Sequence, residues 1–322
     1  MSLLDEAEAL ARQGRLPEAI GLVTGAADRG DAEATTILGH WRLWGVGGPR
    51  DLAAARACFA TAAAAGHVEA ALIEATLTAN GTGAPADWAV GLARLRALAG
   101  RAAAADRQLA LLDAMPIDAD GAPATLPPAE PIEGPIERRT YRKLLTAAEC
   151  DYLMTVATPL IGPSMIVDPA ARRPTPHPTR KSDGMNFGPS LEDLVVHAIN
   201  RRLAAVSGTE VGQGEPLHIL RYGVGQQYLP HLDALPGVAN QREWTVLVYL
   251  NDGYAGGETE FAVDGVRVQG AAGDALVFAN LDAEGRPDPR SQHAGRPVTE
   301  GVKWLATRWI RQRPFQAAPA PR

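Results

Sequence analysis

The sequence predicts a two-domain α + β protein, in which an N-terminal α-helical repeat array precedes a strand-rich domain with flanking helices. Residues 1–112 are dense in Ala and Leu and repeat themselves at a shift of 36 residues. Residues 113–138 are rich in proline, and the remainder has short apolar runs separated by glycine turns. A chain of 322 residues is long enough for two such domains.

The N-terminal repeat is marked by its glycines. Gly30-Asp31-Ala32-Glu33-Ala34 matches Gly66-His67-Val68-Glu69-Ala70, and Gly45-Val46-Gly47 matches Gly81-Thr82-Gly83. A period of this length is typical of stacked helix pairs, with glycine where the chain reverses. The pattern resembles Sel1-like repeats, which are relatives of tetratricopeptide repeats. Such arrays often bind partners on a concave surface, so residues 1–112 are expected either to recruit a partner or only to pack on the next domain.

The segment 113–138 is expected to be a linker, because its prolines interrupt helices and strands alike. In the domain at 139–316, helices are expected at 144–160, with Thr146 as N-cap, and at 191–206. A sandwich or jelly roll follows, with these helices covering one sheet face. The predicted strands lie at 218–222, 244–250, 266–268, 275–278 and 302–310.

Charge and composition argue against several classes of protein. The net charge of −6 and the pI near 5.7 disfavour general binding to nucleic acid or anionic membranes. Cys58 and Cys150 are too few for a disulfide framework or a zinc cluster, which favours a reducing compartment. The chain starts without a basic and apolar leader, and no apolar run has the length of a membrane span. A cytoplasmic protein is expected.

The sequence His231-Leu232-Asp233, with His293 following 62 residues later, is a candidate metal site. Residues i and i+2 of a strand point to the same side, so the first pair can hold one ion together. Two histidines and one carboxylate can occupy one face of iron(II) and leave other positions open. Manganese, cobalt or nickel could occupy the same ligand set.

Several ordered segments around these residues resemble the prolyl 4-hydroxylase group of 2-oxoglutarate-dependent oxygenases. The resemblance covers about residues 140–315 and implies a double-stranded β-helix. It is carried by 220–233, 242–252, 256–261, 273–278, 291–298 and 301–304.

The resemblance implies a role for individual residues of this chain. His231, Asp233 and His293 would bind iron(II), and Lys303 would pair with the distal carboxylate of 2-oxoglutarate. Further residues match positions that contact the cosubstrate or line the substrate side. Tyr228 and Thr259 are the candidate hydroxyl donors to the cosubstrate, and Tyr222, Arg242 and Trp304 are the candidate substrate-side residues.

Several of these assignments have a plain structural alternative: Lys303 could be a solvated lysine, and Tyr228 could serve packing only. Arg242 could form a surface ion pair, and Tyr222 and Trp304 could be core aromatics. The region 169–180 is expected to be a mobile loop. Its charges, Arg172-Arg173 and Arg180-Lys181, could be solvated or could belong to a lid over the active site.

The implied reaction is C–H hydroxylation coupled to conversion of 2-oxoglutarate and O₂ into succinate and CO₂, with ascorbate as a candidate reductant. The carboxylate of Asp233 favours hydroxylation over halogenation, because halogenating relatives lack it. The first expectation for the substrate is a prolyl residue in a protein or peptide. The alternatives are the same chemistry on a small molecule, such as a free amino acid or natural-product intermediate, and a non-catalytic repeat adaptor. The interval from His231 to His293 is short, and the loop at 282–291 is polar. Both features fit a small-molecule substrate as well as a peptide.

Overall fold

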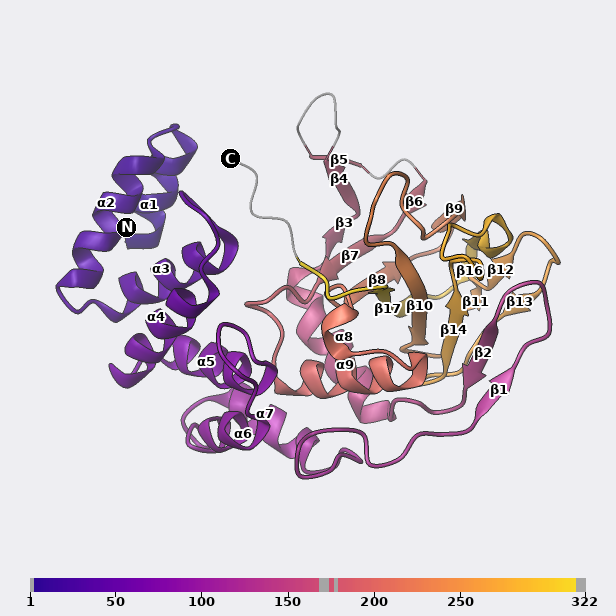
Figure 1. Cartoon of the computed structure of the whole chain (residues 1–322), viewed down its shortest axis with the longest axis horizontal. Helices are drawn as coiled ribbons and strands as arrows, with labels where there is room; N and C mark the ends of the chain where they lie inside the picture. The colour runs from indigo at the N-terminus through magenta and orange to yellow at the C-terminus, as the bar shows by residue number, and fades with distance from the viewer. Residues whose placement is uncertain (1–2, 168–173, 177–178, 317–322) are drawn as a thin grey trace. The chain divides into compact units, whose positions relative to one another are not determined.

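The computed structural model describes residues 3–167, 174–176 and 179–316, and the chain divides into two compact units. Unit 1 contains the chain up to Ala122 together with Pro189–Ala198, and unit 2 contains Pro123–Gly188 and Ile199–Phe315. Figure 1 labels the helices and strands in chain order. Helices followed by a strand-rich half confirm the predicted fold class.

Unit 1 is built from helices of similar length, joined by short turns. Buried alanines such as Ala55, Ala62 and Ala70 pack against Leu43 and Phe59, so the helices approach one another closely. The helices are α1 (Leu3–Arg12), α2 (Leu16–Asp28), α3 (Ala32–Trp44), α4 (Leu52–Ala64), α5 (Val68–Asn80), α6 (Trp88–Arg96) and α7 (Ala103–Leu112).

The repeat seen in the sequence recurs in the geometry of the turns. Helices α3 and α5 each have 13 residues and end at a left-handed glycine, Gly45 with φ 75° and Gly81 with φ 79°. Helices α4 and α6 start after Asp51 and Asp87, whose carboxylates each accept a hydrogen bond from a backbone N–H of the first turn. Because a side chain is strained at positive φ, glycine is needed at the helix ends. The predicted repeat array is therefore confirmed.

Unit 2 is a sandwich of two main antiparallel sheets, in agreement with the predicted jelly roll. The larger sheet has the order β1-β2-β14-β10-β17-β8-β7-β3, and the smaller has the order β13-β12-β15-β9-β6. Strands of the larger sheet are β1 (Ala129–Pro131), β2 (Arg138–Tyr141), β3 (Gly162–Pro163), β7 (Asp183–Asn186), β8 (His218–Tyr222), β10 (Arg242–Tyr249), β14 (Ala275–Ala279) and β17 (Lys303–Arg311). Strands of the smaller sheet are β6 (Arg180–Lys181), β9 (Gln227–His231), β12 (Thr259–Phe261), β13 (Arg267–Val268) and β15 (His293–Gly295).

Two short strand pairs complete the described part of unit 2. Strand β4 (Met165–Val167) pairs with β5 (Pro174–Pro176), and β11 (Ala255–Gly256) pairs with β16 (Val298–Glu300). Between the main sheets, Phe278 of β14 packs edge-on against Phe261 of β12, with ring centroids 5.3 Å apart. Phe278 also packs edge-on against His293, with ring centroids 4.7 Å apart.

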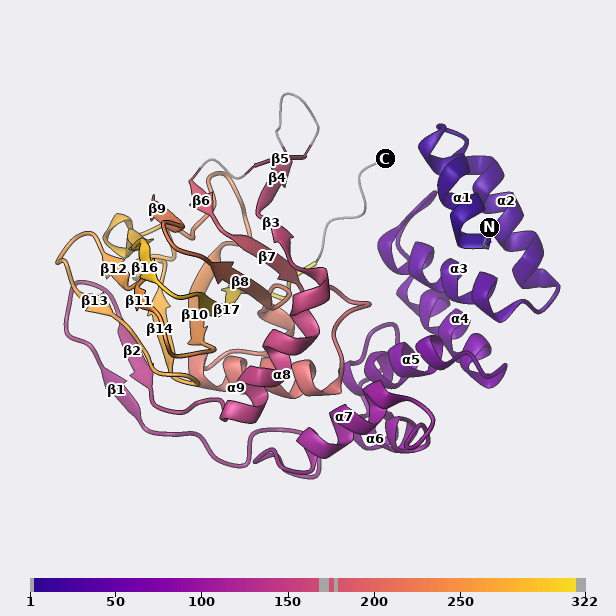
Figure 2. The same ribbon diagram turned by 180° about the vertical axis from the view of Figure 1, so that it is seen from behind.

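The larger sheet is covered on its other face by helices, as Figure 2 shows. Helix α8 (Ala147–Ala157) begins at Thr146, which forms a capping box with Glu149 and confirms the predicted N-cap. Helix α9 (Leu194–Ser207) is held where Arg308 of β17 donates to the carbonyl of Asn200 at 2.6 Å. Short 3₁₀ turns lie at η1 (Thr158–Leu160), η2 (Val211–Gln213) and η3 (Pro289–Ser291).

Two segments differ from the sequence-based expectation. Part of the predicted linker is strand β1, at the edge of the larger sheet, where a proline does not interrupt a ladder on both sides. Part of the predicted loop at 169–180 forms β5 and the start of β6. Residues 168–173 and 177–178, which include Arg172 and Arg173, lie outside the described residues. No helix in the described part of the chain is long and apolar enough to cross a bilayer.

A buried ion pair fixes α8 to α9, and its removal is expected to destabilise unit 2. Arg202 donates to both carboxylate oxygens of Glu149, at 2.8 and 2.9 Å, and both side chains are almost fully buried. The change Glu149→Ala strands a buried charge, so we expect a loss of about 3–5 kcal/mol of unfolding free energy in urea. The exposed Glu284→Ala is the control, with no measurable change expected. Equal stability of the two variants would contradict the prediction.

Candidate active site

His231, Asp233 and His293 converge at the centre of unit 2. His231 ends β9 and His293 begins β15, and the two residues are paired directly across these antiparallel strands. Asp233 lies two residues beyond His231, so its side chain returns to the same side. Its carboxylate oxygens lie 3.6 Å from Nε2 of each histidine. One ligand atom from each residue lies within 4.8 Å of the others, so the three can hold one metal ion.

Backbone carbonyls fix the orientation of both imidazole rings. Nδ1 of His231 lies 2.8 Å from the carbonyl of Leu229, and Nδ1 of His293 lies 3.0 Å from that of Ser291. A carbonyl can only accept, so each Nδ1 carries the proton and donates. In a neutral ring with the proton on Nδ1, Nε2 has the lone pair, and in both residues Nε2 is the nitrogen nearer Asp233. This arrangement is usual for metal-binding histidines, whose second nitrogen is held by an outer partner.

The protonation states also fit a metal. Burial lowers the pKa of His293 to about 4, so the ring is neutral at pH 7. Burial alone would raise the pKa of Asp233, but His293, His231 and Arg242 outweigh it and hold the pKa well below its usual range. Neutral imidazole and ionised carboxylate are the forms that bind divalent metals. The three residues therefore fit an iron(II) ion with open positions.

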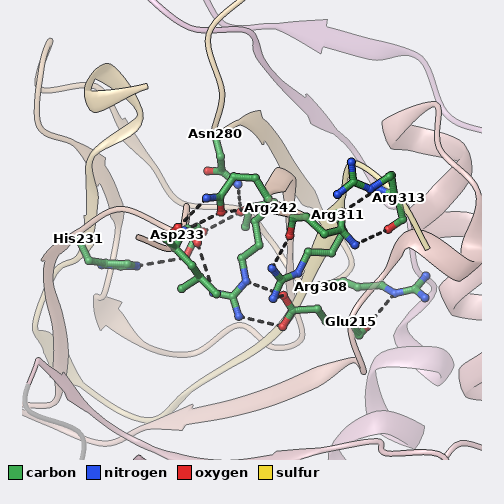
Figure 3. Close-up of polar contacts among 12 residues, drawn as sticks. Glu215, His231, Asp233, Arg242, Asn280, Arg308, Arg311 and Arg313 are labelled. Atoms are coloured by element: carbon green, nitrogen blue, oxygen red, sulfur yellow. Dashed lines mark hydrogen bonds and ion pairs between the residues drawn. The ribbon is translucent and has the colours of Figure 1, made fainter. Parts of the chain in front are cut away.

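Asp233 is held by a buried chain of hydrogen bonds, which Figure 3 shows. Thr245 Oγ1 donates to Asp233 Oδ2 at 2.7 Å, and Asn280 Nδ2 donates to Thr245 Oγ1 at 2.8 Å. All three residues are buried. This chain fixes one carboxylate oxygen. The sequence-based reasoning missed both donors, although a threonine within an apolar strand and an asparagine after β14 are polar residues that need partners.

Arg242 lies beside the triad but is engaged in an ion pair (Figure 3). Its guanidinium donates to both carboxylate oxygens of Glu215, at 2.6 and 2.8 Å, and Arg311 contacts the same carboxylate at 2.6 Å. The Arg242 guanidinium also lies 4.0 Å from the ring centroid of Trp309. The ion-pair alternative thus describes Arg242 in this structure, and contact with substrate stays a prediction.

A cavity opens beside the triad, with Lys303 inside it. The ammonium of Lys303 donates to the carbonyl of Gly257 at 2.6 Å and lies 5.3 Å from the Tyr249 ring centroid. Burial lowers its pKa to about 8, with Glu258 acting in the opposite direction. Among the described residues, no carboxylate is within ion-pair distance of this ammonium. The cavity is lined by Leu220, Tyr222, Tyr228, His231, Asp233, Leu247, Thr259, His293, Ala294, Gly295, Arg296, Lys303, Leu305, Thr307 and Trp309.

The other predicted cosubstrate residues also line this cavity. Tyr228 stacks on His231 with ring centroids 3.4 Å apart, and burial raises the pKa of Tyr228 to about 12. Its hydroxyl is therefore protonated at pH 7. Thr259 Oγ1 lies 3.3 Å from the Tyr249 hydroxyl. Tyr222 is buried in the cavity wall, 5.8 Å by its ring centroid from the Lys303 ammonium.

Trp304 does not lie with the other predicted residues. Side chains alternate along β17, and those of Lys303, Leu305, Thr307 and Trp309 line the cavity. Trp304 therefore faces the other side of the sheet, where the Arg221 guanidinium lies 5.8 Å from a Trp304 ring centroid. Its substrate-side role stays a prediction without support from this geometry. The sequence-based reasoning missed Trp309 and Thr307, which the strand period starting at Lys303 could have found.

The position of Arg180 differs from one of the two alternatives expected for it. It was expected to be either a solvated loop residue or part of a lid. It is instead 8% exposed on β6, paired in register with Tyr228, and its guanidinium lies 5.6 Å from the centroid of that ring. The solvated alternative is wrong for Arg180, because strand pairing brings it under the apolar wall of the cavity.

The comparisons with known proteins show which family this chain resembles. Residues 217–311 match the model of the 2OG-Fe(II) oxygenase superfamily. Prolyl 4-hydroxylase 1 of Arabidopsis thaliana is 35% identical over 52% of this chain and 66% of its own length. Probable prolyl 4-hydroxylase 6 of the same plant is 36% identical over 54% of this chain and 69% of its own length. This chain thus spans about two thirds of these relatives.

Two solved structures are similar to separate parts of the chain. A viral collagen prolyl hydroxylase from Paramecium bursaria Chlorella virus-1, in complex with 2OG, is 25% identical, with a TM-score of 0.44, over 54% of this chain and 95% of its own. A Sel1 repeat protein from Oxalobacter formigenes is 26% identical, with a TM-score of 0.27, over 29% of this chain and 37% of its own.

The jelly roll, the His-Asp-His geometry and the sequence matches define the class of protein. The chain belongs to the 2OG-Fe(II) oxygenase superfamily. Within that superfamily, the two plant relatives described above are named as a prolyl 4-hydroxylase and a probable prolyl 4-hydroxylase, and in this chain an N-terminal array of helical repeats precedes the oxygenase domain.

The hydrogen bond from Thr245 to Asp233 is expected to support metal binding. The change Thr245→Val keeps the shape of the side chain and removes the donor, so Asp233 loses its fixed orientation. Removal of such an outer partner typically weakens metal affinity by about 10- to 100-fold. Titration with Co(II), followed by d–d absorption, measures this affinity. Thr299→Val, at an exposed position, is the control. An affinity equal to that of the control would show that the hydrogen bond does not position the ligand.

Proposed function

We propose that this protein is an iron(II)- and 2-oxoglutarate-dependent dioxygenase that hydroxylates a prolyl residue in a protein or peptide and releases succinate and CO₂. The observation that carries the proposal is the meeting of the His231, Asp233 and His293 side chains with the buried Lys303 in one cavity. A buried ammonium without a carboxylate partner is costly, so the cavity suits an anionic ligand.

Each residue has a defined part in this proposal. When bound, iron(II) supplies O₂ activation coupled to oxidative decarboxylation of 2-oxoglutarate. His231, Asp233 and His293 would hold the ion beside the cavity that they line. Lys303 pairs with the distal carboxylate of the cosubstrate. The attraction is stronger in this buried position than in water, because the surroundings screen it less.

The walls of the cavity serve positioning and the exclusion of water. Tyr228 and Thr259 offer hydroxyl groups on the cosubstrate side. On the substrate side, Tyr222 and Trp309 present aromatic surfaces, which suit the apolar ring of a prolyl residue. An apolar lining also protects the reacting centre from water. The same chemistry on a small molecule is the second candidate, since the cavity itself is compatible with both.

Three expectations from the sequence are not tested by any contact among the described residues. Recruitment of a polypeptide by the helical repeats stays a prediction. The same holds for ascorbate as reductant and for a cytoplasmic location.

Formation of succinate from 2-oxoglutarate, in the presence of iron(II), ascorbate and air, tests the proposed function. We expect His231→Ala to abolish turnover through loss of the metal. Lys303→Ala should raise the KM for 2-oxoglutarate roughly 30-fold or more, because truncating one partner of a buried charge pair costs about 2–5 kcal/mol. Lys143→Ala, at an exposed position outside the cavity, is the matched control and should behave as wild type.

A different result of the same measurement would contradict the proposed function. If the wild type forms no succinate and the metal-loaded protein fails to bind 2-oxoglutarate, the enzyme proposal is wrong. A non-catalytic adaptor function would then take its place.

The pH dependence of cosubstrate binding is expected to follow Lys303. Its pKa of about 8 means that the ammonium is present below that pH and is lost as the pH rises through it. Only the charged form attracts a carboxylate, so the Kd for 2-oxoglutarate should rise above pH 8, by up to about tenfold per pH unit. Anaerobic calorimetry on the metal-loaded protein measures it. In Lys303→Arg the charge persists, so a flat profile between pH 8 and 9.5 is expected. Identical slopes in both proteins would exclude Lys303 as the titrating group.

A further inference from the structure

Three charged side chains line the active-site cavity among the described residues: Asp233, Lys303 and Arg296. In the proposed function, the metal neutralises the charge of Asp233, and a carboxylate of the cosubstrate neutralises the charge of Lys303. Iron(II), Asp233, Lys303 and the 2-oxoglutarate dianion together carry no net charge. Arg296 therefore leaves a positive charge in the cavity wall that neither the metal nor the cosubstrate neutralises.

Among the described residues, Arg296 shares its acidic neighbour Glu260 with a second arginine. Its Nε lies 3.6 Å from Oε2 of Glu260, which is beyond ordinary hydrogen-bond distance. The same oxygen accepts a 2.6 Å hydrogen bond from Arg267, which is outside the cavity. Glu260 is therefore already neutralised by another arginine. The Arg296 side chain is 47% exposed while it lines the cavity, so it lies at the open edge.

A second arginine adds positive potential on the same side. Arg180 on β6 lies over the Tyr228 ring, and Tyr228 is paired across β9 and β15 with Gly295, the residue before Arg296. Arg180 therefore lies next to an aromatic residue of the cavity wall, although its guanidinium is itself buried.

We propose that Arg296, supported by Arg180, selects a substrate that carries a carboxylate close to the carbon that is oxidised. In a polypeptide this group is an Asp or Glu side chain beside the target prolyl residue. In a free amino acid it is the substrate's own α-carboxylate. This inference rests on the proposed function and specifies its substrate class. The contact lies at a half-exposed edge, where an ion pair changes selectivity more than overall affinity.

Hydroxylation of matched peptides by the full chain tests the inference. Three peptides share one sequence around a central proline and differ only in flanking residues, which are Glu, Gln or Lys. Free proline is the fourth substrate. Substrate-dependent succinate formation and the mass of the product give kcat/KM for each, and the readout is the ratio between substrates within one enzyme. This ratio does not depend on the fraction of active protein.

We expect wild type to prefer the Glu peptide to the Lys peptide. Arg296→Gln should reduce that preference by roughly fivefold, which is the size of a half-exposed ion pair, and the effect should reside mainly in KM. Arg296→Glu should reverse the order. Arg142→Gln removes an exposed arginine that does not line the cavity and does not contact Glu260, so it should leave the ratio unchanged. Higher ionic strength should weaken the preference, because the charges are partly exposed.

The outcomes separate this inference from the proposed function. A preference for the Glu peptide that depends on Arg296 supports an acidic polypeptide. Turnover of free proline alone, lost selectively in Arg296→Glu, supports the same carboxylate contact with a small molecule. Equal kcat/KM for the three peptides, or equal effects of the Arg296 and Arg142 variants, overturns the inference while the hydroxylase activity stands. Absence of turnover with every substrate, together with absence of 2-oxoglutarate binding, overturns both.

Discussion

The antiparallel pairing of β9 with β15 places His231 directly opposite His293, and the remainder of the site is arranged around this pair. Side chains alternate along a strand, so a slip of one residue would turn a histidine away from the cavity. The register therefore determines whether a metal site exists at all. Apolar packing between the sheets holds that register. The Phe278 ring of the larger sheet lies 4.7 Å by centroid from the His293 ring.

Polar side chains that are buried between the two sheets need hydrogen-bond partners. Several strands and loops provide them. Asp233 is supported through Thr245 of β10 and Asn280 after β14, and each histidine by a carbonyl of its own chain segment. Unpaired burial of any of these groups would cost free energy that only water or a metal could offset. The hydrogen bonds thus serve stability and metal geometry together. Lys303 differs, because among described residues it has a carbonyl acceptor but no carboxylate close enough for an ion pair. The positive charge of Lys303 can therefore pair with an anionic cosubstrate.

The two strand faces of β17 explain which aromatic residues can take part in recognition. Trp304 was expected on the substrate side, but it is adjacent to Lys303 and so faces the opposite way. Trp309, six residues from Lys303, faces the same way as that lysine and lines the cavity. Matching single residues along a motif is less reliable than following the period of the strand. The same reasoning applies to Arg242, whose proximity to the triad is real but whose guanidinium is occupied by Glu215.

The sequence by itself determined the order of the two parts, the 36-residue helical repeat, the N-cap at Thr146 and the residues of the candidate metal site. These features depend on local spacing, on glycine at left-handed turns and on the two-residue period of a strand, all of which can be read along the chain. Tertiary structure alone decided the pairing of His231 with His293, the support of Asp233 by Thr245 and Asn280, and the burial of Arg180 beside Tyr228. It also decided that Arg296 lies at the edge of the cavity, where it shares the carboxylate of Glu260 with Arg267. The physical reason is that these contacts join residues far apart in sequence, and only the register and packing of the sheets bring them together.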